Sequence, residues 1–144
     1  VKIGFGYPFL YVRGYAFRGK WTSPEPLLLE QDYGLEFIPM VINVPADGLR
    51  LEAYLVSEGT AILLAECRPY SFRATLYGRV TDSDNRYDVL SHRVAIDLAP
   101  YRGSRVSLQW VLKDADSGAE VDLPAAIGDP KLIAKTAGVG AKSP

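Results

Sequence analysis

The stretch LRLEAYL, residues 49–55, decides the fold class because apolar residues occupy every second position along it. A β-strand points successive side chains to opposite faces, so this alternation is typical of a strand with one face on a core. The other face then carries Arg50, Glu52 and Tyr54 toward water. The stretch therefore predicts one strand of a sheet that packs against a second layer.

The same period of two recurs along the chain, which extends the prediction from one strand to the whole fold. Residues 72–80, 90–98 and 106–112 alternate clearly, and the last of these runs puts Trp110 on the core side. Turn-forming Gly, Asp, Asn and Pro residues separate the runs. No stretch of helical length has a period of 3.6 residues, so the sequence predicts an all-β sandwich or barrel.

Further strands are expected where the alternation is weaker. These stretches are residues 27–31, 35–44, 61–66 and 125–134. Pro39 falls inside the second of them. Because proline donates no hydrogen bond to a β-ladder, it predicts an edge position or a bulge there.

We expect one domain over residues 1–135 and a flexible tail or linker over 136–144. A chain of 144 residues is long enough to hold a core, since a domain near this size buries roughly 68–70% of its unfolded surface. The tail consists of small residues, which is typical of a linker. Residues 1–21 are rich in aromatic residues and glycine, and one or two strands are expected there. Because the chain begins at Val1, we expect a processed form, an excised domain or an incompletely observed chain.

The composition argues against several classes of protein. The chain has 16 Lys and Arg residues and 17 Asp and Glu residues, for a net charge of −1. A nucleic-acid binder usually has a basic excess that neutralises phosphates, and no apolar run approaches the ~20 residues of a membrane helix. Cys67 is the only cysteine, so we expect neither an internal disulfide nor a Cys-based zinc site. The sequence predicts no nucleic-acid partner and no membrane span.

Several short motifs follow one another in an order that is familiar from one superfamily. They are IDL at 96–98, YRG at 101–103, VSLQW at 106–110, GDPKLI at 128–133 and, more weakly, VPADGLRL at 44–51. In this order the chain, chiefly over residues 89–133, resembles the galactose-binding-domain-like jelly rolls, which include many carbohydrate-binding modules. The resemblance implies a jelly-roll β-sandwich of about eight or nine antiparallel strands. It also implies glycan binding or a role as an accessory domain beside an enzyme.

The chain offers little catalytic machinery. His92 is the only histidine, and it shares the parity of Leu90, Val94 and Ile96, which favours a partly buried, hydrogen-bonded side chain over a general base. The sequence holds no Gly-x-Ser-x-Gly elbow, no P-loop and no dinucleotide fingerprint. We therefore expect a non-catalytic domain. A hydrolase or lyase that uses His92 or paired carboxylates is the weakest alternative.

Two acidic turns are the candidate metal sites. Calcium prefers several oxygen ligands, which carboxylate-rich loops supply. One turn carries Asp114, Asp116, Glu120 and Asp122, and the other carries Asp82, Asp84 and Asp88. The first turn is the candidate site for a structural calcium ion, and the alternative interpretation is a solvated hairpin tip.

Exposed aromatic rings beside polar groups are the candidate ligand-binding residues, because rings contact the C–H faces of sugars while polar groups bind hydroxyls. Tyr54 shares the outward face of its strand with Arg50, and Tyr77 lies between Arg73 and Arg79 on the next alternating run. If the two strands lie in one sheet, they form a shared platform. That platform would accept a neutral glycan, an acidic polysaccharide or an acidic protein surface.

Two other interpretations of the aromatic residues stay open. Trp21, with Tyr15 and Tyr11, forms an alternative ligand-binding patch. The tyrosines on the outward faces also suit an ordinary polar sheet face, since tyrosine has a high strand propensity.

The sequence predicts a non-catalytic carbohydrate-binding module, part of or accessory to a larger protein, with a glycan or polysaccharide as its partner. The alternative is a structural, assembly or protein-interaction domain, such as a capsid, appendage or accessory subunit. In that case the aromatic segment 1–21 would pair with the sheet edge of a neighbouring subunit. A secreted or cell-surface location is the expected one.

Overall fold

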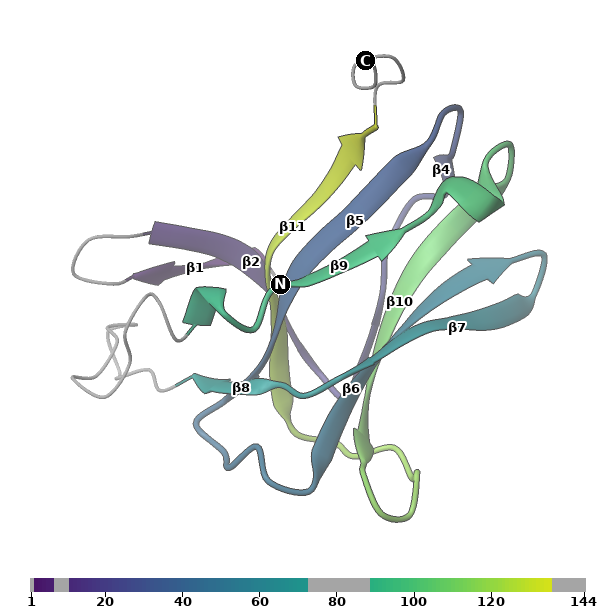
Figure 1. Cartoon of the computed structure of the whole chain (residues 1–144). Helices are drawn as coiled ribbons and strands as arrows, with labels where there is room; N and C mark the ends of the chain where they lie inside the picture. The colour runs from purple at the N-terminus through teal and green to yellow at the C-terminus, as the bar shows by residue number, and fades with distance from the viewer. Residues whose placement is uncertain (1, 7–10, 73–88, 136–144) are drawn as a thin grey trace.

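The computed structural model describes residues 2–6, 11–72 and 89–135, which form two β-sheets that pack face to face (Figure 1). The predicted all-β sandwich is confirmed. In chain order the strands are β1 (Lys2–Gly6), β2 (Tyr11–Arg18), β3 (Lys20–Thr22), β4 (Leu27–Leu28), β5 (Tyr33–Ile42), β6 (Leu49–Ser57), β7 (Thr60–Cys67), β8 (Tyr70–Phe72), β9 (Val94–Asp97), β10 (Arg105–Asp114) and β11 (Pro124–Ala134). One 3₁₀ turn, η1 (Ala99–Tyr101), connects β9 to β10.

Each sheet combines strands that are distant in the sequence. The first sheet has the order β1-β2-β11-β5-β8, and β9 also pairs with β5. The second sheet has the order β3-β10-β6-β7, and β4 also pairs with β10. The described residues thus hold more strands than the eight or nine expected. Nor are all the pairs antiparallel, because β5 and β8 run parallel.

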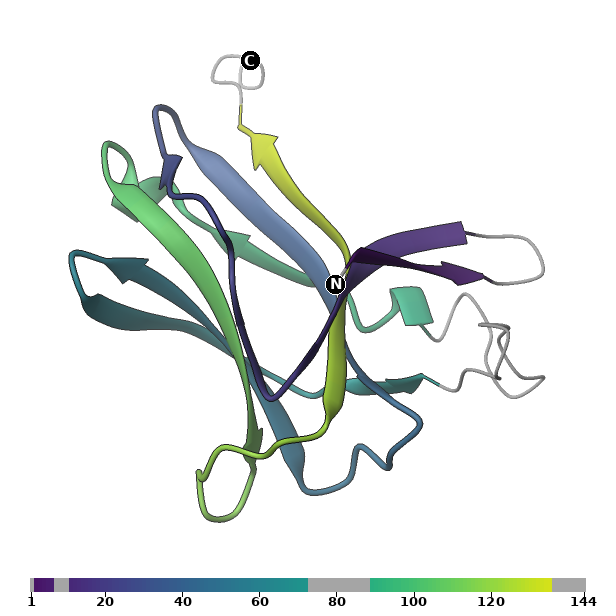
Figure 2. The ribbon, with the colours of Figure 1, turned by 180° about the vertical axis from the view of Figure 1, so that it is seen from behind.

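The N-terminal segment accounts for part of the difference, because it supplies three strands rather than one or two. Its strand β2 pairs with β11 in the first sheet, and β3 pairs with β10 in the second. The chain changes sheets at Gly19, where φ is 69° and a Cβ would lie 3.0 Å from the carbonyl oxygen of Val121. Glycine suits both this backbone conformation and this close approach. Figure 2 shows that the segment leading to β4 runs beside β10.

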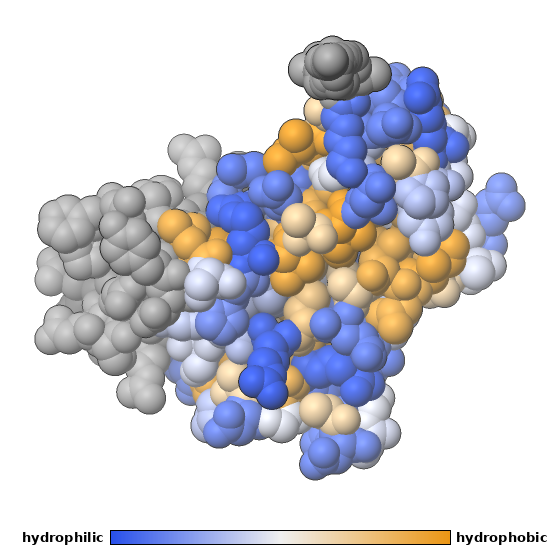
Figure 3. Space-filling view, viewed as in Figure 1, coloured by the Kyte–Doolittle hydropathy of each residue, from blue (hydrophilic) through white to orange (hydrophobic). Residues whose placement is uncertain are grey.

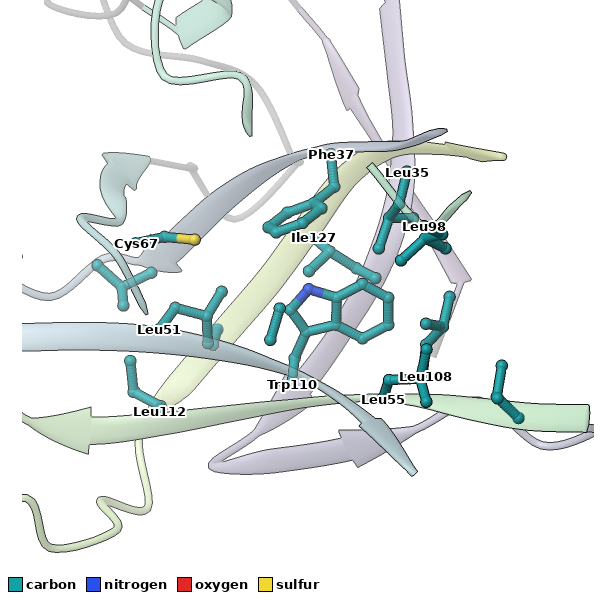
Figure 4. Close-up of a cluster of buried hydrophobic side chains, with 14 of the residues drawn as sticks. Leu35, Phe37, Leu51, Leu55, Cys67, Leu98, Leu108, Trp110, Leu112 and Ile127 are labelled. Carbon is teal, nitrogen blue, oxygen red and sulfur yellow. The ribbon is translucent and has the colours of Figure 1, made fainter. Parts of the chain in front are cut away.

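The alternating runs of β6 and β10 place their apolar residues in the core, as predicted. Leu51 and Leu55 of β6 are buried, and Trp110 of β10 is 2% exposed. The Trp110 ring meets Phe37 of β5 edge to face at 5.5 Å between centroids, so side chains of both sheets interlock between the layers (Figure 4). Apolar burial of this kind contributes roughly 25 cal/mol per Å² and holds the two sheets together.

Pro39 lies in the central strand β5, where the sequence predicted an edge position or a bulge. On one side of β5, Pro39 is the register partner of Ile127 in β11. On the other side, β9 pairs with β5 up to Phe37, and β8 pairs with it from Met40 onward. Pro39 therefore occupies the gap between two short partner strands, and none of the described residues pairs with it on that side of β5.

Two other expected strands are shorter than their alternation suggested. Over 90–98, the strand begins at Val94, because Val89 and Leu90 accept turn hydrogen bonds from the N–H groups of His92 and Arg93. Over 27–31, the pairing is limited to the two residues of β4. Of the run 72–80, Phe72 ends β8 and the rest lies outside the described residues, as does the expected tail at 136–144. Within the described ranges, no helix is long and apolar enough to cross a membrane.

Candidate functional site

The outward face of the second sheet carries a polar cluster around a carboxylate that is almost fully buried. Glu52 of β6 is 3% exposed, although its parity points it away from the core. The Glu52 carboxylate accepts hydrogen bonds from Arg50 Nε at 2.6 Å and from the hydroxyl of Tyr54. Lys113 Nζ of β10 lies 2.8 Å from Glu52 Oε1. We call these four residues the Glu52 cluster.

Two opposing effects set the pKa of Glu52. Burial is the largest single effect and acts to raise it. The hydrogen bonds from Lys113, Tyr54 and Arg50 act together in the other direction and hold the pKa below its ordinary value. The same contacts raise the pKa of Lys113 to about 12, chiefly through its hydrogen bond with Glu52. The pair is therefore charged over the whole neutral range.

The Glu52 cluster engages both of the predicted ligand residues on β6, Arg50 and Tyr54. The Tyr54 hydroxyl donates to Glu52 and accepts from Lys113 Nζ at 3.0 Å. Arg50 also donates to the carbonyl of Ala115, which fixes the β10–β11 turn against β6. Lys113 lies 5.5 Å from the centre of the Tyr54 ring and covers part of its face. The contacts of Lys113 with Glu52 and Tyr54 join β10 to β6 across the outward face.

The second half of the predicted platform is not joined to Tyr54 by the described residues. Phe72, the first residue of the run that contains Tyr77, pairs with Ile42 in the first sheet, whereas Tyr54 belongs to the second. Arg73, Tyr77 and Arg79 lie outside the described residues. The predicted shared platform stays a prediction.

Beyond the Glu52 cluster, the outward face of the second sheet becomes more open. Tyr54 is the register partner of Gln109, whose amide donates to Thr22 of β3 at 2.9 Å. Two residues further along the strands, Val56 of β6 is the partner of Ser107 in β10. Alternation places all of these side chains on one face.

This face leads into a groove at the end of the sandwich, where the β6–β7 turn approaches the chain before β10. The groove has a volume of about 560 Å³. Hydroxyl groups and two opposite charges characterise its lining, and we call it the serine groove. It is lined by Pro26, Val56, Ser57, Glu58, Gly103, Ser104, Arg105, Val106 and Ser107. Among the described residues, no ion pair occupies the guanidinium of Arg105 or the carboxylate of Glu58.

The Trp21 patch lies on the opposite side of the second sheet, between the two layers. Trp21 stacks on Tyr15 at 5.0 Å and on Trp110 at 5.7 Å between ring centroids. The three rings line a cleft of about 260 Å³, which we call the aromatic cleft. Its other lining residues are Ser23, Leu27, Leu35, Leu108, Ile127, Pro130, Lys131 and Leu132. The side chain of Tyr11, the third predicted member of the patch, is outside the described set.

The predicted calcium turn uses its acidic side chains in other ways. Asp114 Oδ1 accepts the backbone N–H groups of Ser117 and Asp116 at 2.9 Å each, and these bonds hold the pKa of Asp114 below its ordinary value. Glu120 pairs with Lys20, and Asp122 pairs with Arg18. Across residues 2–6, 11–72 and 89–135, no three Asp, Glu, His or Cys residues form a group that could hold a metal ion. The second turn, with Asp82, Asp84 and Asp88, lies outside these ranges.

The two most reactive side-chain types in the chain sit in packed surroundings. The ring of His92 meets the ring of Tyr70 edge to face at 5.2 Å, and its Nδ1 lies 3.4 Å from the Ser91 hydroxyl. His92 belongs to a turn, so the parity argument from the run 90–98 does not apply to it. Cys67 is buried, and burial raises the pKa of its thiol to about 11.

No protein-family model matches this chain, and no curated protein matches its sequence. Function must therefore be inferred from the residues that the fold brings together. The sequence pattern does not indicate the serine groove, because its lining residues come from three separate segments. The alternation of 106–112 already placed Ser107 and Gln109 on an outward face, but the register that sets them beside Val56 and Tyr54 is a tertiary feature.

Proposed function

We propose that this chain is a non-catalytic, jelly-roll-type carbohydrate-binding domain that binds a glycan along the outward face of the second sheet and in the serine groove. The single observation that supports this most is the groove itself. It combines an arginine, a carboxylate and three serine hydroxyls in a volume of about 560 Å³. The continuous face toward Gln109 and Tyr54 gives room for further sugar units.

The chemistry of the groove suits vicinal hydroxyl groups. Arg105 offers several N–H donors in a planar fork, whereas Glu58 accepts hydrogen bonds at two oxygens. Ser104 and Ser107 can each donate and accept, and the Ser57 oxygen, whose hydrogen goes to the Arg105 carbonyl at 3.3 Å, can accept. Pro26 and Val56 give apolar contact for the C–H face of a ring. A neutral saccharide fits better than an acidic one, because Glu58 would repel a second carboxylate.

Affinity electrophoresis and calorimetry with a panel of neutral and acidic polysaccharides test this proposal. We expect saturable binding to at least one neutral glycan. Arg105→Ala should weaken that binding at least fivefold, since a hydrogen bond to a charged group contributes about 1.5–3 kcal/mol.

Arg102→Ala is the matched control, because Arg102 is exposed on the same turn but pairs with Asp32 outside the groove. Arg102→Ala should leave glycan affinity unchanged. If the folded chain binds no glycan, or if both arginine variants weaken binding equally, the proposal is wrong.

A second candidate function is protein interaction, and the edge of the second sheet favours it. Within the described part of the chain, β7 pairs with β6 alone, which leaves its other edge free. Ile62 is 37% exposed and Leu63 is 47% exposed on this strand. Figure 3 shows apolar side chains gathered on the face between β9 and β7. Exposed edges and apolar patches of this kind are typical of interaction surfaces.

Light scattering and crosslinking of the whole chain over a range of concentrations test this second candidate. Association that Leu63→Lys abolishes would support it, because a charge on an edge strand discourages pairing. Glu30→Lys, on an exposed loop, serves as the control for added charge. A chain that stays monomeric at every concentration would argue against self-association through β7.

A further inference from the structure

Strand β11 loses one of its two partner strands part of the way along the first sheet. β2 pairs with β11 only as far as Gly128, the register partner of Gly14. β5 pairs with β11 through to Ala134 on the other side. No other strand of the described residues takes the place of β2 beside residues 131–134. Figures 1 and 2 both show β1 and β2 pointing away from the yellow end of β11. We call this side of residues 131–134 the free edge of β11.

The pairing with β5 shows which main-chain groups point to the free edge. The Lys135 N–H donates to the carbonyl oxygen of Asp32 at 2.8 Å, in continuation of the β11–β5 register. Hydrogen-bonded and non-hydrogen-bonded positions alternate along an antiparallel pair. Leu132 and Ala134 are therefore non-hydrogen-bonded positions. The carbonyl of Tyr33, opposite Ala134, agrees with this, because it accepts its hydrogen bond from the chain that follows β9. The N–H and carbonyl groups of Leu132 and Ala134 thus point to the free edge.

The free edge also borders the aromatic cleft. Lys131 and Leu132 are consecutive, so their side chains point to opposite faces of the sheet, yet both residues line the cleft. The main chain between them therefore forms part of the wall. The side chain of Leu132 shares the face of its register partner Leu35, which also lines the cleft. Main-chain hydrogen-bonding groups and an apolar pocket thus lie next to each other.

We propose that the free edge of β11 and the aromatic cleft together bind an extended peptide segment of another protein. The segment adds to the first sheet as an antiparallel strand and inserts one aromatic side chain into the cleft. This proposal does not depend on glycan binding, which concerns the outward face of the second sheet.

A polypeptide main chain is the partner that matches this edge. Leu132 and Ala134 present donors and acceptors about 7 Å apart, which is the two-residue repeat of a β-strand. Strand addition takes its affinity from main-chain hydrogen bonds and its specificity from pockets for alternate side chains. The antiparallel direction follows β2, which pairs in that way with the same side of β11. A peptide residue opposite Leu132 shares its face and points into the cleft.

The volume of the cleft limits that side chain to about one ring. An apolar cavity of roughly 150 Å³ suffices to hold benzene, and the aromatic cleft measures about 260 Å³. The adjoining rings of Tyr15, Trp21 and Trp110 favour an aromatic side chain, because ring edges and faces attract one another. The neighbouring peptide residues point to the outer face, where Ile133 is 41% exposed. Threonine suits these positions because of its high strand propensity.

Intrinsic fluorescence measures binding at this place, because Trp21 and Trp110 both line the cleft and the chain has 2 tryptophans. The probe is the acetylated and amidated peptide Thr-Ala-Thr-Phe-Thr-Ala-Thr, which contains no tryptophan. Titration of the whole chain with this peptide should give a saturable fluorescence change. Replacement of the phenylalanine by serine should weaken binding at least about fivefold, because the ring would no longer be buried.

Methylation of single peptide nitrogens separates strand addition from burial of the ring alone. In the antiparallel arrangement, the phenylalanine N–H points to β11, whereas the N–H of the threonine after it points to solvent. Methylation of the phenylalanine nitrogen should weaken binding about fivefold, which is the scale of one main-chain hydrogen bond. Methylation of that threonine nitrogen is the matched control and should have little effect. N-acetyl-phenylalanine amide, which has the ring without a strand, should bind more weakly than the peptide.

A substitution in β11 tests the same edge from the side of the protein. Ala134→Pro removes an N–H that points to the free edge, and proline is tolerated where the N–H faces away from the ladder. This variant should bind the peptide about fivefold more weakly. Lys135→Gln is the control, because the Lys135 side chain pairs with Asp97 and its N–H bonds to Asp32. Thermal unfolding shows whether Ala134→Pro folds, and the methylated peptides test the proposal if it does not.

Four results would overturn the proposal. They are no saturable signal with the peptide, equal binding of the two methylated peptides, equal binding of N-acetyl-phenylalanine amide and the peptide, or self-association of the chain that Ala134→Pro abolishes. The last result would assign the free edge to a second copy of the chain. Glycan binding, measured in parallel with Arg105→Ala, should be unaffected by the peptide, so failure at one site is distinguishable from failure at the other.

Discussion

Lys113 Nζ lies 2.8 Å from Glu52 Oε1 and joins two neighbouring strands on a face that alternation alone assigns to solvent. Glu52 is nevertheless 3% exposed. Its burial is possible because every oxygen of the carboxylate has a charged or hydroxyl partner. The outward face of the second sheet is therefore packed at one end and open at the other.

Glu52→Gln should destabilise the fold by about 2–3 kcal/mol. Breaking a fully buried ion pair costs about 3–5 kcal/mol, and the cost here is lower because Lys113 and Arg50 keep some contact with water. Urea unfolding measures the difference. Glu30→Gln, on an exposed loop, is the control and should change stability by less than ~0.5 kcal/mol.

Acid should remove the contribution of Glu52 to the free energy of unfolding. Its pKa in the folded state is below the ordinary value of 4.5, so the stabilisation is fully present above pH 4.5 and is lost as the pH falls through the folded value. Unfolding free energies measured between neutral pH and strong acid should fall less steeply in Glu52→Gln than in the wild type. Parallel curves for the two proteins would contradict this assignment.

Alkali should also weaken the Glu52 cluster, because it removes the proton from Lys113. The pKa of Lys113 rises from 10.5 to about 12, chiefly through its hydrogen bond with Glu52. The stabilisation is complete below pH 10.5 and is lost as the pH rises through about 12. Chemical unfolding near pH 11, compared between the wild type and Lys113→Met, would show whether the alkaline loss disappears with the amine.

Trp110→Phe should cost much less stability than Trp110→Ala. The indole Nε1 has no hydrogen-bond partner within the described residues, so a phenyl ring there removes a buried donor that is unsatisfied. Truncation to alanine leaves a cavity, at a cost of about 3–5 kcal/mol. Thermal and urea unfolding of both variants give the comparison. Equal losses would indicate that the indole nitrogen has an acceptor.

Gly19→Ala should destabilise the chain more than Gly59→Ala does. Both glycines have positive φ, 69° and 80°, which costs an alanine about 1–2 kcal/mol. A Cβ at Gly19 would also lie 3.0 Å from the Val121 carbonyl oxygen, whereas a Cβ at Gly59 would meet nothing within 4 Å. The difference in unfolding free energy between the two variants measures the cost of the contact between the added Cβ and the Val121 carbonyl oxygen.

The sequence predicts the candidate binding sites less well than it predicts the two-sheet fold. Residue types predict Trp21 and Tyr15 as one patch, and the fold brings them together in one cleft. Strand parity predicts Arg50 and Tyr54 on one outward face, but it does not reveal their hydrogen bonds with Glu52 and Lys113. Arg105 and Glu58 carry no sequence signal of their own, because neither residue type nor spacing shows that two distant turns meet.

The sequence by itself determined that the chain is all-β and which faces of β6 and β10 form the core. Alternation is a local property, because each strand points its side chains to opposite sides whatever its partners are. The tertiary structure alone decided the strand order, the position of Pro39 between two short partner strands and the register shift between Gly128 and Lys131. These features depend on register between segments far apart in the chain, and such register is set by packing rather than by local pattern.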